Sequence, residues 1–380
     1  MRITGLTSRI LEYDLRDAYG DGPIPKEIFD TRYHISLDTL HTDEGIDGHT
    51  MQYGGLGEGR AIGHVLHEAY AGDLVGRDPR EIERIWQDLR RKNRHMYNLT
   101  DAVVGAIDIA LWDLRGKMTG QPIAALLGLA RDRVPCYATA RTIAPTPEQV
   151  FAEAQLRKSE GFRGLKVQFW DGLELDVPRF RAAREGAGPD FPLMQDAGGE
   201  YSFVDALAAG RVLEELGYHW FEEPIPDRQL DQLRRLTNEL AIPILAMETL
   251  RLHEMPEHFR HAAADIARGD VLIKEGITGL RKACATAELF GYNLEIHGLG
   301  PALLDLANLH VALSVENCEY VEAHDPLYQR GIVGSPLAID DEGCRVLPDA
   351  PGLGVEIDWD WVDDNTVEVI RSGDVPAGVV

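Results

Sequence analysis

One pattern repeats from residue 134 onward and constrains the fold more than any other feature of the sequence. Each repeat is a short apolar run followed by a stretch with helical periodicity, the order that a parallel strand–helix array requires. The repeats recur at intervals of roughly 25 to 30 residues, as a closed barrel of alternating strands and helices needs. The candidate strands are 134–137, 164–168, 192–195, 220–221, 244–246, 271–273, 293–296 and 319–321. We therefore predict an α/β fold built on a TIM-type barrel, (β/α)7β.

The residues before the barrel have a different texture. Apolar and polar positions alternate up to about residue 55, with breaks at 20–23 and 43–45 that predict two or three antiparallel strands. Helical periodicity follows over 61–73, 79–92 and 100–117. We expect an α+β capping domain over residues 1–130, the barrel domain over 131–335, and a turn-rich segment over 336–380 that packs back on the cap.

Charge and cysteine usage limit the partners and the compartment. The chain has 63 acidic and 38 basic residues and a net charge of -25, which disfavours nucleic acid and anionic membrane surfaces. Its four cysteines form no CxxC pair, so neither a disulfide framework nor a zinc knuckle is indicated. The first residues lack the charged start and apolar block of a signal peptide. We expect a cytoplasmic protein that binds a small molecule, neither nucleic acid nor membrane.

Three carboxylates follow consecutive candidate strands at equal intervals along the chain. Asp196 comes after FPLMQ, Glu222 after HWF and Glu248 after ILAM. The carboxyl ends of barrel strands meet on one face, where active sites lie, so these acids should converge. Any one of them alone would be interpreted as a solvated loop residue. Together they predict a site for a hard cation with oxygen ligands, Mg²⁺.

Two further groups lie at neighbouring strand ends. Lys166 is in GLKVQ and His297 is in LEIHG, while Asp270 precedes His297 by one repeat. A carboxylate can hold an imidazole in one tautomer and orient it as a base. With a cation and a lysine nearby, such a base can remove a carbon-bound proton and stabilise the enediolate that results.

At these motifs the chain resembles the enolase superfamily, mandelate racemase subgroup. The similarity covers nearly the whole chain and rests on 106–128, 161–168, MQDAG, WFEEP, AMET, 269–280, EIHG and 347–358. It implies Asp196, Glu222 and Glu248 as magnesium ligands and Asp270 with His297 as a catalytic dyad. It also implies Glu322 as an acid that hydrogen-bonds a substrate oxygen, with Glu316 and Glu319 as competitors for that position.

Departures from the family pattern decide among activities. The family usually has Lys-x-Lys at the second barrel strand, where this chain has Lys166 and Gln168, and it often has Asn where this chain has Gly198. Glutamine cannot accept a proton at neutral pH, which disfavours a racemase with one base on each face of the substrate. Some subgroups have a lysine base at the sixth strand, near Lys274, but only Asp270 has His297 as a partner.

A site with one base suits elimination of water from an acid sugar to give a 2-keto-3-deoxy acid. We expect the cap to select the substrate, and the candidate contacts are Gln168, Arg32, His34, His49 and Arg141. Lys166 and His297 both remain candidates for the base. A racemase, epimerase or cycloisomerase on the same scaffold is the alternative, and a non-catalytic metal-binding barrel is the alternative from another class. A barrel hydrolase would need a His-x-His that the first strand lacks, and a retaining glycosidase would leave the third acid unexplained. The resemblance also implies a homo-oligomer.

Overall fold

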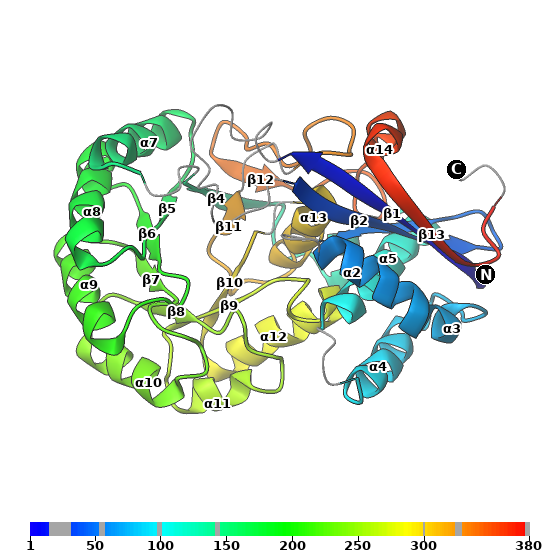
Figure 1. The fold of residues 1–380 in the computed structure, drawn as a ribbon, viewed down its shortest axis with the longest axis horizontal. Coiled ribbons are helices and arrows are strands. Elements are labelled where there is room, and N and C mark those ends of the chain that lie inside the picture. The colour runs from blue at the N-terminus through cyan, green and yellow to red at the C-terminus, as the bar shows by residue number, and fades with distance from the viewer. Residues whose placement is uncertain are drawn as a thin grey trace.

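Parallel strands form a closed barrel beside a smaller cap (Figure 1). A computed structural model describes residues 1–14, 32–52, 58–96, 101–140, 145–298, 301–323 and 329–376. In this part of the chain, eight parallel strands pair in sequence order, and β11 pairs with β4 to close the ring. The strands are β4 (Arg133–Thr139), β5 (Leu165–Gln168), β6 (Leu193–Asp196), β7 (Trp220–Glu222), β8 (Ile244–Ala246), β9 (Ile266–Gly269), β10 (Asn293–Ile296) and β11 (Val321–Ala323). The predicted α/β barrel is confirmed.

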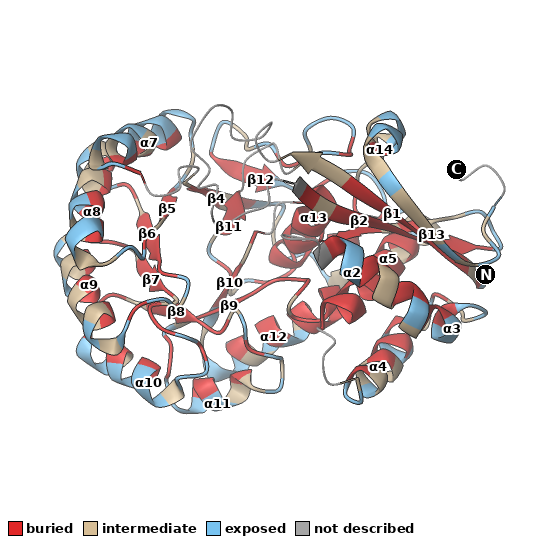
Figure 2. Ribbon diagram, in the orientation of Figure 1, coloured by how far each residue is buried: buried red, intermediate tan, exposed pale blue. Residues whose placement is uncertain are grey.

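Helices connect successive strands and surround them. They are α7 (Pro147–Ser159), α8 (Leu173–Ala187), α9 (Phe203–Glu215), α10 (Leu230–Glu239), α11 (Met255–Arg260), α12 (Gly276–Phe290) and α13 (Ala302–Ala312). Local sequence sets their ends: Thr146 and Gln149 form a capping box at the start of α7, and Gly291 ends α12 in the left-handed conformation. The strands are buried while the outward faces of α7 to α11 are exposed (Figure 2). The face of the barrel at the carboxyl ends of the strands is therefore formed by the strand ends and the loops.

The cap is an antiparallel sheet covered by helices. The sheet order is β13-β1-β2-β3, so the C-terminal strand β13 returns to pair with β1, whereas β12 pairs with β4 of the barrel. The strands are β1 (Ile3–Asp14), β2 (Arg32–Thr42), β3 (Gly48–Gln52), β12 (Cys344–Val346) and β13 (Thr366–Gly373). The helices are α2 (Glu58–Val65), η2 (Leu66–Tyr70), α3 (Ala71–Leu74), α4 (Ile82–Asn93), α5 (Ala102–Thr119), α6 (Ile123–Leu127) and α14 (Trp359–Asn365).

Helix α5 joins the cap to the barrel because it is buried on nearly every side. Its periodic apolar residues Val104, Ile107, Leu111 and Leu114 are at most 1% exposed. Its Asp108 accepts hydrogen bonds from the backbone N–H and the hydroxyl of Thr278 at the start of α12, at 2.8 and 2.7 Å. Buried apolar side chains consequently form one continuous cluster through cap and barrel.

Two predicted strands were wrong or displaced. Residues 271–273 form a turn, and the sixth strand is β9 five residues earlier. The reason is Arg268, which interrupts the apolar run of β9 although it is fully buried. The eighth strand lies two residues beyond the predicted 319–321. No helix in the described ranges has both the length and the apolar character of a membrane span.

Candidate active site

Three side chains at the carboxyl ends of adjacent strands lie side by side. In the sheet register, Gln168 of β5 is opposite Asp196 of β6, which is opposite Glu222 of β7. Met194 and Trp220 lie two residues earlier on the same faces of β6 and β7, in a small apolar cluster. The acids therefore stand on an apolar layer inside the barrel, and Glu222 is fully buried. Glu248 follows two residues after the end of β8.

Lys166 lies among three of the carboxylates. Its ammonium is 3.2 Å from Asp196, 3.2 Å from Glu222 and 3.0 Å from Glu322. Burial would lower the pKa of Lys166, but the carboxylates of Glu222, Glu322 and Asp196 outweigh burial and raise that pKa well above its usual value. These carboxylates favour the ammonium form of Lys166, and a cation held by Asp196 and Glu222 would weaken that effect.

Arg268 is a second buried cation, which the sequence analysis missed. Its guanidinium is 3.0 Å from Glu222, 2.5 Å from Glu322 and 3.5 Å from Glu248, and it donates to the Tyr137 hydroxyl at 2.8 Å. The only sequence signal was a charged residue inside an otherwise apolar run before Gly269-Asp270. Such a residue is usually interpreted as solvated.

Glu322 is the acid inside β11, while Glu316 and Glu319 are exposed. Besides the two cations, its carboxylate accepts from the Thr139 hydroxyl and from the backbone N–H of Gly298. These four donors stabilise the ionised form of Glu322. Glu322 therefore orients Lys166 and Arg268.

His297 and Asp270 form the predicted pair. Nδ1 of His297 is 3.1 Å from Oδ2 of Asp270, and the other carboxylate oxygen accepts from the backbone N–H groups of Leu272 and Ile273 at 2.7 and 2.8 Å. Burial alone would raise the pKa of Asp270, but these contacts lower it. An ionised Asp270 favours the proton on Nδ1, so in the neutral imidazole Nε2 is the nitrogen that can accept a proton.

The charge of this dyad depends on Glu248. Burial would lower the pKa of His297, but the carboxylate of Glu248 and the hydrogen bond to Asp270 raise it to about 9. A cation held by Glu248 would offset that effect and bring the imidazole toward its neutral, basic form.

The cluster has more negative than positive charge. In the described part of the chain, no group of three or more His, Cys, Asp or Glu side chains is arranged so that it could hold a metal ion by itself, and Lys166 and Arg268 lie among the carboxylates. Burial nevertheless raises the pKa of Glu222 to about 7 and that of Glu223 to about 10. The two cations therefore do not fully offset the cost of burying Glu222. An oxygen-rich site with excess negative charge fits a divalent cation.

The predicted substrate contacts in the cap have partners within the cap. Nε2 of His34 is 3.0 Å from Glu12. His49 contacts the Thr39 hydroxyl through Nδ1 at 3.0 Å and packs edge-on against Trp359. Arg141 and the side chain of Arg32 lie outside the described residues. These contacts do not bring His34 or His49 into the carboxylate cluster.

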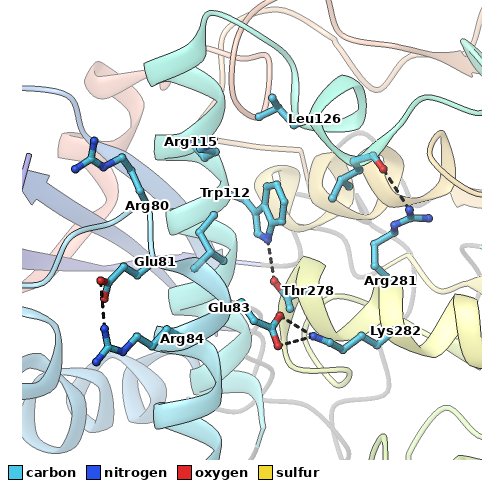
Figure 3. Close-up of a pocket in the computed structure, with 12 residues that line it drawn as sticks. Arg80, Glu81, Glu83, Arg84, Trp112, Arg115, Leu126, Thr278, Arg281 and Lys282 are labelled. Carbon is cyan, nitrogen blue, oxygen red and sulfur yellow. Dashed lines mark hydrogen bonds and ion pairs between the residues drawn. The ribbon is translucent and has the colours of Figure 1, made fainter.

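A surface cavity lies elsewhere on the molecule. It has a volume of about 710 Å³ and is bordered by α4, α5 and α12. Figure 3 shows Glu83 paired with Lys282 of α12, and Glu81 paired with Arg84 three residues further along the chain. Acids of the cavity thus neutralise these cations, and none of the predicted site residues lines it.

Comparison with known proteins identifies the family. The chain matches the enolase C-terminal domain-like family over residues 149–361 and the mandelate racemase/muconate lactonizing enzyme N-terminal domain over residues 31–128. D-Galactarolactone cycloisomerase of Agrobacterium fabrum is 31% identical over 379 residues, which cover 95% of this chain and 97% of that protein. This chain belongs to the enolase superfamily, mandelate racemase subgroup.

Two further relatives also cover most of the chain. Arabinonate dehydratase of Saccharolobus solfataricus is 33% identical over 324 residues, 80% of this chain and 85% of that enzyme. The crystal structure of D-glucarate dehydratase from Agrobacterium tumefaciens, complexed with magnesium, has a TM-score of 0.85 and 32% identity. It covers 97% of this chain and 100% of that one. The family and fold predicted from the sequence are confirmed.

The structure accounts for both departures from the superfamily pattern at Asp196. Gln168 donates from Nε2 to Oδ2 of Asp196 at 3.0 Å, and the backbone N–H of Gly198 donates to Oδ1 at 2.9 Å. Gly198 has a φ of 55°, a conformation that glycine adopts without strain. Gln168 thus orients an acid at the place where the family usually has a base.

Proposed function

We propose that this protein is an acid-sugar dehydratase that removes the proton alpha to a carboxylate and expels the beta-hydroxyl as water. The observation that carries the proposal is the asymmetry of the site. The His297–Asp270 pair offers one base, while on the second strand Gln168 cannot accept a proton and the Lys166 ammonium is held between three carboxylates. Elimination needs a single base, whereas racemisation through two faces needs two.

Asp196, Glu222 and Glu248 would hold a magnesium ion, since oxygen ligands and excess negative charge are what this cation requires. The magnesium reported for the related D-glucarate dehydratase structure supports this assignment. When bound, the ion supplies positive charge that stabilises an enediolate.

The residues of this chain divide the remaining work. Nε2 of His297 takes the alpha proton while Asp270 holds the imidazole in its tautomer and stabilises the imidazolium. The Lys166 ammonium adds positive charge beside the developing enediolate. His297 then returns its proton to the leaving hydroxyl, which departs as water, and the enol tautomerises to a 2-keto-3-deoxy acid.

A cycloisomerase is the second candidate. It would use the same single base and differ only in the fate of the enediolate. The similarity to D-galactarolactone cycloisomerase favours it.

The test is turnover of a library of aldonic and aldaric acids with Mg²⁺ in deuterated water. Semicarbazide detects 2-keto acids, and NMR follows exchange of the alpha proton. We expect a keto acid from the native protein and a loss of at least roughly 100-fold in His297→Asn, the scale of general acid–base catalysis. The matched control is His261→Asn, since His261 is an exposed histidine beside α11.

Each other outcome has a definite meaning. Deuterium exchange or ring isomerisation without keto acid would replace the dehydratase by an isomerase or cycloisomerase. A folded protein that neither exchanges protons nor forms product across the library would favour a non-catalytic metal-binding barrel. Equal activity of His297→Asn and the native protein would contradict the assignment of the base.

A further inference from the structure

The short loop that carries Glu248 is held on its N–H side by one buried carboxylate. Asp227, in the loop after β7, accepts from the backbone N–H of Met247 at 2.6 Å and from that of Thr249 at 2.7 Å. It also accepts from the Thr249 hydroxyl at 2.8 Å. Asp227 is itself fixed, because its backbone carbonyl accepts from His258 at 2.8 Å.

The carbonyl side of the same loop is held by one buried ammonium. Nζ of Lys274 donates to the backbone carbonyls of Met247, Glu248 and Leu250 at 2.8, 2.7 and 2.5 Å. A lysine has three N–H donors, and all three have partners in this one loop. Lys274 therefore has no proton-accepting or donating role left for a substrate, which argues against a lysine base at the sixth strand.

The loop needs this support because its backbone is unusual. Met247 has a φ of 84°, a conformation that side chains other than glycine rarely adopt and that persists only where the surroundings enforce it. Both supporting groups are charged and at most 2% exposed. Burying two charges for their effect on one loop is costly, so the loop geometry must matter to the protein.

Lys274 also connects this loop to the dyad. Its backbone N–H donates to the carbonyl of Asp270 at 3.0 Å, so the same residue bonds the loops that carry Glu248 and Asp270. Its side chain passes over Gly269, where a Cβ would lie 2.8 Å from Cε and 2.9 Å from Cγ of the lysine. Glycine at 269 leaves the space through which the lysine reaches the Glu248 loop.

We propose that Asp227 and Lys274 are positioning residues that set the place of the Glu248 carboxylate relative to the His297–Asp270 pair. The inference rests on the proposed function, because it takes Glu248 to be a ligand of Mg²⁺. Neither side chain touches the substrate; both act through the backbone of residues 247–250.

The test measures Mg²⁺ affinity by calorimetry, without substrate, in the full-length protein. Lys274→Met removes the three donors but keeps an apolar side chain, and Asp227→Asn keeps the shape but removes the charge. We expect each to weaken Mg²⁺ binding roughly 10- to 100-fold, the effect of losing a residue that orients a metal ligand. Two controls should leave the affinity unchanged: Lys282→Met, in helix α12 that follows Lys274, and Asp231→Asn, whose exposed carboxylate pairs with Arg234.

The outcomes separate the two proposals. Absence of Mg²⁺ binding by the native protein would overturn the metal assignment on which the proposed function stands. Native binding with unchanged affinity in both folded variants would overturn the positioning role alone. If Lys274→Met does not fold, as judged by circular dichroism, Gly269→Ala replaces it, because the added methyl displaces the lysine without removing its charge. Native affinity in Gly269→Ala and Asp227→Asn would then also overturn the proposal.

Discussion

At the scale of single residues, the site is a balance of buried charges. Glu222 and Glu322 have Lys166 and Arg268 as shared partners, and none of these four side chains is more than 1% exposed. A buried pair of this kind contributes little compared with well-packed apolar residues, but removal of one partner leaves an uncompensated charge. Loss of one of these two cations should therefore lower the free energy of unfolding more than loss of a cation from an exposed ion pair does.

Arg268→Met tests this balance. We expect the free energy of unfolding to fall by about 3 to 5 kcal/mol, because Glu222 and Glu322 lose a buried partner. Urea denaturation measures the change. Arg211→Met is the matched control, since Arg211 and Glu239 form an exposed pair at 3.9 Å and such pairs contribute less than about 1 kcal/mol. Similar losses in the two variants would show that burial does not set the cost.

At the scale of elements, helices α5 and α12 connect cap and barrel, and they approach each other closely at Gly276. Gly276 begins α12 with a φ of 91°, and a Cβ there would lie 2.4 Å from the carboxylate of Asp108. That carboxylate is already fixed by Thr278. Neither partner can move away without breaking these hydrogen bonds.

Gly276→Ala should therefore destabilise the protein more than its backbone angle alone explains. We expect a loss of about 1 to 2 kcal/mol for an alanine in the left-handed region, with a further loss of about 1 to 3 kcal/mol from overpacking. Gly291→Ala at the other end of α12 isolates the first effect, since Gly291 has a φ of 82° and open space around it. Thermal and urea unfolding compare the two. Equal losses would mean that α5 yields to the added methyl.

The elements also show what the sequence could predict. Strands β8 and β10 begin and end at the predicted residues, because an apolar run between turn residues reports burial directly. Strand β9 was missed because the sequence does not distinguish a buried arginine with ion-pair partners, such as Arg268, from a solvated one. The acids at the strand ends were predictable from spacing. The contacts of Lys166, Arg268, Asp227 and Lys274 were not, because they depend on side-chain directions and on residues far apart in the chain.

At the scale of the whole molecule, three histidines with lowered pKa values make stability depend on pH. Burial lowers the pKa of His49, His67 and His310 to about 4, while each should titrate near 6.5 in the unfolded chain. The unfolded state thus binds more protons between these values. The effect of these three histidines is therefore to leave the free energy of unfolding unchanged above about pH 6.5 and to lower it as the pH drops toward 4.

His310→Gln should reduce this dependence. His310 is fully buried, and its Nδ1 accepts from the backbone N–H of Ala124 at 3.1 Å, a role that a glutamine oxygen can fill. We expect the drop in unfolding free energy between pH 7 and pH 4 to shrink by about 3 kcal/mol. Urea denaturation at the two pH values measures it, with His261→Gln at the exposed histidine as the control. An unchanged drop would mean that His310 is charged in the folded protein.

Closure of the barrel has a consequence for how the chain acquires activity. The pairing of β11 with β4 joins residues 321–323 to 136–138, and Glu322 reaches Lys166 and Arg268 only once this seam has formed. Contacts so distant along the chain form slowly, because a long loop must be closed before they contribute. A folding intermediate with seven strands in place would hold both cations with only one of their two shared carboxylates, Glu222. Recovery of Mg²⁺ binding during refolding should accordingly lag behind recovery of helix, and a kinetic trace of the two signals would time the arrival of the last strand.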